Sequence, residues 1–452
     1  MEGIPLSFHD KFLKEKADNE IEFKFDRRKY KTHFSSLPQA RNSTPRKSKN
    51  NEGLAELYDV KAGAFELRAG AGQRCEGNAS CIPICPVNAK YSALRTYREL
   101  QDLAKNNRFF EFELQSQAVV TKVNVGKNTR HISSLDFYYY PHSEVPAKEF
   151  KTIEAASFVL AASAIENAKI LLMSGQPGIG LCNASDELGR NLMDHPFVLH
   201  WGLLKDKKVE LGTFRGPGIT SDLPVRTGPW RKNHAAFRTD VSNWGWGLAA
   251  SAPYSNLASL LKSQKFGKQL REDLRSEVQR QVTFGYLFEQ LPCSDNRVTI
   301  DPSQRDQLGI PRPNLNYRID PYTLKGMECA KVLTKTAFDK IGIQNFTNYK
   351  AQLGNKIKSD SAKRHKYIGA GHIMGTHRMG SHKSNSVVDE FQRSWDYQNL
   401  FVIGAGSMPT AGTSNPTLTL AALSLRSADE YMKCKDAMSR NWGHREQEMA
   451  NG

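Results

Sequence analysis

The segment from Gly371 to Asp429 constrains the fold of this chain more than any other part of it. Residues 400–403 form a short apolar run, as expected for a buried strand, and a glycine-containing turn follows at 404–406. Pro416 then precedes apolar residues at helical spacing, namely Leu418, Leu420, Ala421, Leu423 and Leu425. The spacing predicts a helix with Asn415 at its N-cap and Pro416 at its first position.

A second strand and helix occur earlier in the chain. The run 157–162 predicts a buried strand, and Ser163 with Glu166 forms a capping box that starts a helix ending at Gly175. Strand, tight turn and helix in this order indicate an α/β nucleotide-type layer. From about residue 197 to 370 the pattern changes to mixed strands with long helices at 254–282 and 321–341. We therefore predict an α/β fold in two separated pieces around an inserted α+β domain.

Other stretches complete the expected organisation. Residues 91–106 predict a helix, and alternation over 109–125 predicts strands. The expected divisions are an irregular N-terminal segment (1–74), a cysteine loop with part of the nucleotide-binding domain (75–196), a substrate-binding domain (197–371), the C-terminal part of the first domain with the catalytic motifs (372–436) and a tail (437–452).

The charge of the chain predicts a basic surface without a nucleic-acid site. The 452 residues carry a formal net charge of +16, but Lys and Arg are scattered and no aromatic-basic module accompanies them. No apolar run approaches the ~20 residues of a membrane span, and residues 1–16 lack the apolar core of a signal peptide. The sequence therefore leaves the localisation open.

His372 and Asn415 are the expected chemical pair. An imidazole can take a proton from an alcohol near neutral pH, and an amide can hold the same oxygen without competing for the proton. The positive end of the predicted helix would face the site. His377, five residues after His372, is expected to be structural; a His-x4-His metal pair is the alternative, although no third ligand is evident.

Cys75, Cys81 and Cys85 lie close together in the spacing C-x5-C-x3-C-P. Three thiolates on a turn-rich loop suit an iron-sulfur cluster, because soft sulfur ligands match iron. A disulfide or free thiols, and a zinc site with a fourth ligand from elsewhere, are the alternatives.

The dinucleotide fingerprint G-x-G-x-x-G does not occur in its expected context. Residues 70–72 are Gly-Ala-Gly but do not open a helix, and the turn at 404–406 has Pro409 where the third glycine would stand.

At five ordered motifs the chain resembles the glucose-methanol-choline (GMC) flavoprotein oxidoreductases, and among them the iron-sulfur sugar and alcohol dehydrogenase subunits. The motifs are the cysteine segment, FVLAASAIENAKILLMSG, LGRNLMDHP, NRVTI and the C-terminal block around HIMGT. The resemblance implies an FAD/NAD(P)-binding-like fold, FAD as cofactor and a 3Fe-4S centre on the three cysteines. It assigns the proton acceptor to His372 and its partner to Asn415. Because the family's FAD fingerprint is missing, the chain is expected to be a truncated, split or mis-started member that does not hold FAD alone.

The same resemblance implies which residues lie against FAD. Those expected beside the adenosine part are Val120, Ala161, Ala162 and Glu166. Gly406 and Ser407 are expected near the diphosphate, and Pro416 and Thr417 near the flavin. For Val120, Ala161 and Ala162, simple strand packing is the alternative.

The resemblance predicts dehydrogenation of a CH-OH group in a sugar, polyol or alcohol. Electrons would leave through the cluster to an external acceptor such as a cytochrome, with a small accessory subunit as a further partner. An oxygen-using oxidase of the pyranose oxidase kind and a flavin-free, non-enzymatic remnant are the two alternatives.

Overall fold

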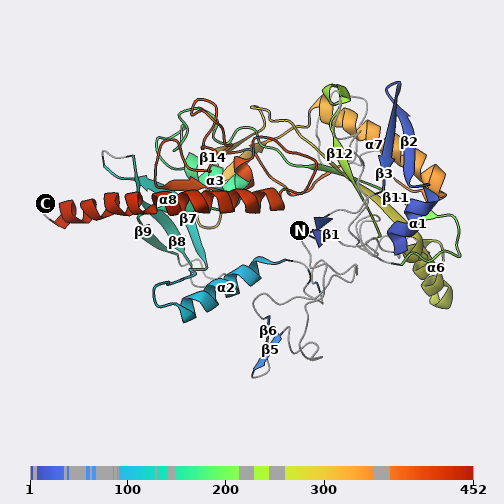
Figure 1. Cartoon of the computed structure of the whole chain (residues 1–452), viewed down its shortest axis with the longest axis horizontal. Coiled ribbons are helices and arrows are strands. Elements are labelled where there is room, and N and C mark those ends of the chain that lie inside the picture. The colour runs from blue at the N-terminus through green and yellow to red at the C-terminus, as the bar shows by residue number, and fades with distance from the viewer. Residues whose placement is uncertain are drawn as a thin grey trace. The chain divides into compact units, whose positions relative to one another are not determined.

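A computed structural model of the chain describes residues 2–3, 8–34, 38–39, 58–61, 64–67, 85, 89, 91–127, 130–140, 148–212, 229–243, 260–347, 349 and 367–450 (Figure 1). Contacts divide the chain into two compact units. Unit 1 comprises Met1–Leu114, Phe197–Phe288 and Tyr322–Ile368, and unit 2 comprises Gln115–Pro196, Glu289–Pro321 and Gly369–Gly452. Residues 289–321, which the sequence pattern places in the inserted domain, thus lie in unit 2.

Unit 1 is built on an antiparallel sheet in the order β12-β13-β11-β16. Its strands are β11 (Pro196–Leu204), β12 (Phe237–Ser242), β13 (Gln281–Phe288) and β16 (Ile343–Asn345). Every residue of β13 is buried, as expected for a central strand. Helix α7 (Pro321–Ile341), with the predicted bounds, packs on this sheet through Phe338, whose ring centroid lies 5.1 Å from that of Phe284.

The prediction of an irregular N-terminal segment is wrong for residues 8–33. They form α1 (Phe8–Lys16) and the hairpin of β2 (Glu20–Phe25) and β3 (Arg28–His33). The hairpin alternates exposed and buried residues, so that Phe23 and Tyr30 reach the core of unit 1. Lys325 of α7 pairs with Asp26 at 2.8 Å. The alternation of polar and apolar residues in EIEFKF is the sequence pattern that could have predicted this strand.

The remaining elements of unit 1 are short or helical. They are β1 (Glu2–Gly3), β4 (Pro38–Gln39), β5 (Tyr58–Lys61), β6 (Ala64–Leu67), α2 (Ala93–Asn106), η2 (Pro229–Lys232), α6 (Gly267–Arg280) and β17 (Ile368–Gly369), which ends in unit 2. The predicted helix at 254–282 is confirmed in type over most of its described part but is not continuous: residues 260–262 and 267–280 (α6) are helical, residues 263–266 are not, and β13 begins at Gln281. Sheet pairing overrides helix propensity there.

In unit 2, two parallel strands carry the nucleotide-type layer predicted from the sequence. β10 (Phe158–Leu160) pairs with β18 (Leu400–Val402), and α3 (Ser163–Leu172) follows β10. The strand is shorter than predicted, and Val159 is 54% exposed. The capping box is wrong, because the N-cap of α3 is Ala162, without a side-chain cap, and Ser163 has a φ of 78°.

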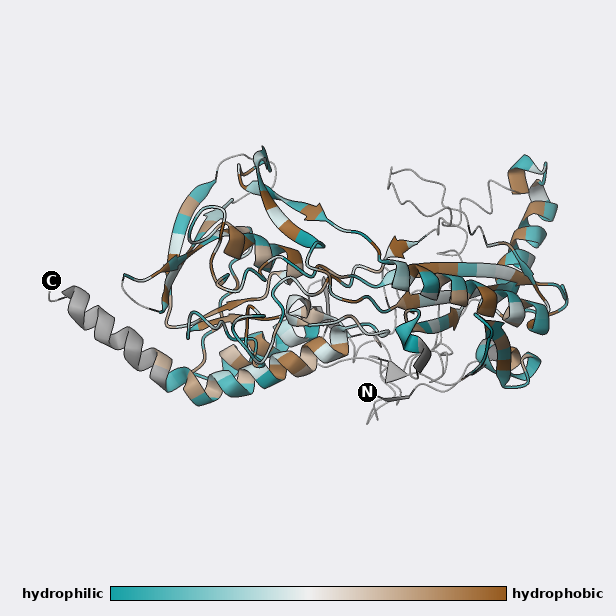
Figure 2. Ribbon diagram, turned by 90° about the horizontal axis from the view of Figure 1, so that it is seen from above, coloured by the Kyte–Doolittle hydropathy of each residue, from teal (hydrophilic) through white to brown (hydrophobic). Residues whose placement is uncertain are grey.

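The rest of unit 2 surrounds this layer. Its other elements are the meander β7 (Ala118–Val125), β8 (Ile132–Tyr139) and β9 (Glu149–Glu154), the hairpin β14 (Arg297–Arg305) and β15 (Pro311–Asn316), the short η3 (Ala405–Ser407) and the long α8 (Thr417–Ala450). Residues 109–117, predicted as strand, form none. Helix α8 continues through the segment predicted as a tail, and apolar residues recur along its N-terminal part (Figure 2).

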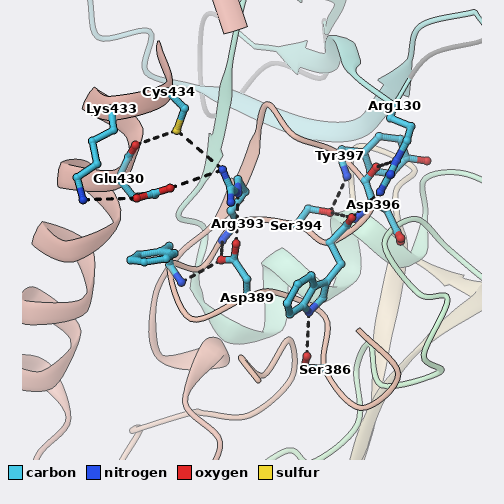
Figure 3. A network of polar contacts seen from close by, with 12 residues as sticks. Arg130, Ser386, Asp389, Arg393, Ser394, Asp396, Tyr397, Glu430, Lys433 and Cys434 are labelled. Atoms are coloured by element: carbon cyan, nitrogen blue, oxygen red, sulfur yellow. Dashed lines mark hydrogen bonds and ion pairs between the residues drawn. The ribbon is translucent and has the colours of Figure 1, made fainter. Parts of the chain in front are cut away.

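A polar network fixes the middle of α8 against the loop that precedes β18 (Figure 3). Arg393 of the loop contacts both the Asp389 carboxylate, at 3.2 Å, and Glu430 of α8, at 3.8 Å. Asp389 also accepts hydrogen bonds from the backbone N–H groups of Phe391 and Arg393. Asp389 is buried and Arg393 half-buried, so this network ties the middle of α8 to the loop.

Candidate functional site

His372 and Asn415, 43 residues apart, meet in unit 2. The Asn415 Nδ2 atom lies 3.2 Å from the Nε2 atom of His372. His372 is half-buried and Asn415 is exposed, so the pair is accessible to a small molecule. The side-chain amide can donate to a ring nitrogen or to an oxygen, and the ring can accept a proton. The sequence prediction that these residues act together stays a prediction, and their geometry is consistent with it.

The pair is held by the backbone of two sequence motifs that run antiparallel. The segments 189–195 and 370–376 exchange hydrogen bonds at several positions, which are Gly189 N to Thr376 O (2.7 Å), Met193 N to Met374 O (3.0 Å), Met374 N to Met193 O (2.8 Å) and Ala370 N to His195 O (3.0 Å). At Gly375, with a φ of 91°, a Cβ atom would overlap the backbone oxygen of Asn191. Only glycine allows this approach.

Asp194 joins the two segments through its side chain. Its Oδ1 atom accepts from the backbone N–H of His195, at 2.7 Å, and from that of His372, at 2.8 Å. Its Oδ2 atom accepts from Gly371 N at 3.2 Å. The carboxylate occupies the space that a Cβ atom at Gly369 would need. A buried carboxylate with several N–H donors is a strong clamp, because charge-assisted hydrogen bonds exceed neutral ones.

His195 places its ring against that of His372. The two centroids lie 5.0 Å apart and the ring planes cross at 86°. The Nδ1 atoms of the two rings are 2.9 Å apart, and His195 Nε2 lies 2.8 Å from the carbonyl oxygen of Gly412. His195 is 1% exposed. His195 belongs to the motif LGRNLMDHP, but no role was predicted for it.

Pro416 and Thr417 stand at the N-terminus of α8, beside the pair. The helix begins at Thr417, one residue later than predicted, and its first i to i+4 bond runs from Leu420 N to the Pro416 carbonyl at 2.8 Å. The side chain of Asn415 contacts His372 instead of serving only as a cap. The N–H groups of the first turn lack intrahelical acceptors, and the helix dipole is positive here, so this end favours an anionic group.

Of the residues predicted near the adenosine, Ala161 and Ala162 lie at the carboxyl end of the parallel strand β10, where open α/β sheets bind ligands, and Glu166 lies in the first turn of α3. Ala161 and Ala162 are exposed in the turn after β10, and Glu166 pairs with Lys169 at 3.3 Å. Asn167, which the sequence analysis did not single out, is fully buried and fixes this turn. It accepts from Ala162 N (2.8 Å) and donates to the carbonyls of Leu160 (3.3 Å) and Ile403 (3.0 Å).

Gly406 and Ser407 form the turn after β18. The His377 ring covers Gly406 so closely that a Cβ atom there would overlap it, and His377 N donates to Gly406 O at 2.9 Å. The Ser407 hydroxyl is buried between Gln392, whose Nε2 lies at 2.5 Å, and the Gly404 carbonyl, at 2.8 Å. Any contact of Ser407 with a ligand would therefore use its backbone.

His377 is a buried neutral histidine. Burial lowers its pKa to about 3, although the Ile403 carbonyl opposes the shift. Among the described residues, no group of three or more His, Cys, Asp or Glu side chains is arranged to hold a metal ion. The His377 ring is fully buried against Gly406. This position is consistent with a structural role, which stays a prediction.

Val120 lies in β7, half-buried, opposite Phe137 and next to a β-bulge between Val120 and Lys122. Its side chain packs against the apolar core of unit 2. A bulge leaves backbone groups outside the strand ladder, as backbone contact with a ligand requires.

Of the three cysteines, the structure describes only Cys85, a half-buried free thiol. Cys75 and Cys81 lie outside the described residues, so the predicted cluster stays a prediction. In the described part of the chain no helix is both long and apolar enough to cross a membrane.

Comparison with known proteins agrees with the motifs. Family models described as GMC oxidoreductase match residues 60–197 and 292–424. The fructose dehydrogenase large subunit of Gluconobacter japonicus is 29% identical, over 88% of this chain and 62% of that protein. The paromamine 6'-oxidase of Streptomyces fradiae is 26% identical, over 83% and 61%. The 2-methyl-1,2-propanediol dehydrogenase of Mycolicibacterium austroafricanum is 27% identical, over 61% and 48%. The chain thus spans less than two thirds of each relative.

Proposed function

Because this chain belongs to the GMC oxidoreductase family, we propose that it takes part in the FAD-dependent oxidation of a CH-OH group in a sugar, polyol or alcohol. The observation that carries this proposal is the pairing of His372 with Asn415 at 3.2 Å, at the positive end of α8. The names of the relatives refer to fructose and to a propanediol, which contain the CH-OH groups that such a pair would hold.

The residues around the pair fit a flavin. The N–H groups at the first turn of α8, which have no acceptor within the helix, would hold the ring near Pro416 and Thr417, where negative charge is favourable. The strand-end turns with Ala161, Ala162 and Gly406, and the backbone at Val120, would hold the rest of FAD. When bound, FAD supplies a hydride acceptor.

The protein's own groups would handle the hydroxyl of the substrate. The Asn415 amide donates a hydrogen bond to the oxygen and orients it, and His372 takes the hydroxyl proton on Nε2. The Asp194 clamp keeps His372 in place through its backbone, so the base need not be ordered during each reaction cycle.

The direct test is reduction of the flavin-loaded protein under anaerobic conditions. Mixing with a panel of sugars, polyols and simple alcohols is expected to bleach the flavin absorbance with at least one of them. Deuterium on the carbon that carries the hydroxyl should slow the bleaching, because that C–H bond breaks. If dithionite bleaches the flavin but no member of the panel does, the proposal is wrong.

For the electron path, we propose that Cys75, Cys81 and Cys85 hold an iron-sulfur cluster that passes electrons to an external acceptor such as a cytochrome. The spacing supports this role, since three thiolates suit a 3Fe-4S centre. The relative from Gluconobacter japonicus is called a large subunit, which favours a further subunit as partner.

Anaerobically prepared protein is expected to contain about three irons per chain, as three-thiolate ligation implies. Cys81→Ser should remove the iron and stop electron transfer to a cytochrome, while substrate still bleaches the flavin. Cys293→Ser, at a half-buried cysteine outside the motif, is the matched control and should keep the iron. Zinc in place of iron, or an unchanged cytochrome rate in Cys81→Ser, would contradict the assignment.

A further inference from the structure

The two ring contacts of His195 determine where its proton lies. Nε2 is 2.8 Å from the carbonyl oxygen of Gly412, and a carbonyl oxygen can only accept a hydrogen bond. Nε2 therefore carries the proton. In the neutral ring the other nitrogen, Nδ1, is then an acceptor.

The same reasoning extends to His372. Its Nδ1 atom lies 2.9 Å from the accepting Nδ1 atom of His195, so it must be the donor of that hydrogen bond. A neutral His372 then carries its proton on Nδ1 and has its lone pair on Nε2. That is the nitrogen beside the Asn415 amide, whose Nδ2 donates toward it. Each link in this chain of contacts follows from the one before it.

We propose that His195 is a positioning residue that holds His372 in the Nδ1–H tautomer and so presents Nε2 as the base. This inference rests on the proposed function and names the device that prepares its base. The histidine of the LGRNLMDHP motif thereby acquires a role in orienting the reacting nitrogen. The proton of the substrate hydroxyl forms its new bond to Nε2 of His372, while the Nδ1–H bond to His195 stays in place.

The backbone arrangement favours this role over simple packing. The Oδ1 atom of Asp194 accepts from the N–H groups of both His195 and His372, so one carboxylate oxygen sets the positions of both residues. The carbonyl that orients His195 belongs to Gly412, three residues before Asn415. The two rings and the amide are thus held by neighbouring segments of the chain. A change of tautomer in either ring would place two acceptors or two donors opposite each other.

Two substitutions separate the positioning role from a packing role. In His195→Asn, the side-chain Oδ1 can stand where Nδ1 stood and can accept from His372. In His195→Gln, the longer amide reaches toward Gly412 but places no acceptor at the Nδ1 position. His195→Asn removes more volume than His195→Gln at this buried site, so a packing role would make His195→Asn the more harmful change, which is the opposite order.

The first readout is the tautomer of His372 in flavin-free protein labelled with ¹⁵N-histidine, at a pH where the ring is neutral. Protonated and unprotonated ring nitrogens differ clearly in chemical shift, and His372→Gln identifies the signals. We expect Nδ1–H in the unmodified protein and in His195→Asn, and a shift toward Nε2–H in His195→Gln. An Nε2–H form in the unmodified protein, or no change in His195→Gln, would overturn the inference.

The second readout is the rate of flavin reduction in the loaded protein. His195→Gln should slow flavin reduction by roughly 10-fold or more, which is part of the 10²–10⁴-fold that a placed general base contributes. His195→Asn should recover most of this loss. A rate in His195→Gln that equals or exceeds the rate in His195→Asn would mean a packing role and overturn the inference. Because the tautomer is measured without flavin or substrate, its result stands even if no CH-OH donor reduces the flavin, which would sink the proposed function alone.

Discussion

Replacing His372 by Ala is expected to slow flavin reduction by roughly 10²-fold or more, the usual scale for losing a positioned general base. The reason is that Nε2 of His372 is the ring nitrogen beside Asn415 and would be the acceptor of the hydroxyl proton. The variant should still bind FAD, since its backbone N–H to Asp194 remains. The measurement is the anaerobic rate of bleaching with saturating substrate.

Asn415→Ala provides a graded comparison. It should slow reduction by roughly 10-fold, less than His372→Ala, because it removes a hydrogen bond worth about 1–2 kcal/mol and leaves the base in place. His382→Ala is the matched control, since His382 lies in the same region but is exposed and bonds locally to Ser384. If His372→Ala reduces flavin at the unmodified rate, the base lies elsewhere.

Gly375→Ala is expected to lower the free energy of unfolding of unit 2 by roughly 2–5 kcal/mol. The φ of 91° alone costs an alanine about 1–2 kcal/mol. The added Cβ atom would also overlap the backbone oxygen of Asn191, which cannot rotate away as a side chain could. Overpacking adds about 1–3 kcal/mol. Urea unfolding followed by circular dichroism measures the loss.

Gly371→Ala is the control for this effect. Gly371 has a φ of 75°, similar to that of Gly375, but no atom of the described chain lies within 4 Å of its Cβ position. The variant should lose only the roughly 1–2 kcal/mol of the backbone conformation. Equal losses in the two alanine variants would show that the close pairing of segments 189–195 and 370–376 does not limit stability.

The family and the mixed α/β fold class could be predicted from the sequence because short motifs carry them. The strand predicted at 400–403 and the helix predicted after Pro416 are both confirmed. Their bounds are Leu400–Val402 for β18 and Thr417–Ala450 for α8. The pairing of β10 with β18 could not be read from either strand alone. It joins residues more than 240 positions apart, and its register depends on packing.

Of the candidate site, the sequence identified the residues with reactive groups but not those that hold them. His372 and Asn415 stand out by residue type, whereas Asn167 and Asp194 act through backbone groups of distant segments. Contacts between distant segments produce no regular spacing of residues that could be recognised in the sequence. His195 had one signal, its place in a quoted motif, but its partner at position 372 becomes apparent only once the two segments are seen to pair.

The carbonyl of Gly412 has a consequence for how this site could change during evolution. In many enzymes the histidine is oriented by a carboxylate, which a single substitution can remove and acid can neutralise. Here the chain of contacts starts at a main-chain oxygen, which no side-chain replacement deletes and which does not titrate in the physiological range. The orientation of the His195 ring is therefore inherited with the path of the backbone, and substrate preference can change without altering which nitrogen reacts as long as His195 is retained.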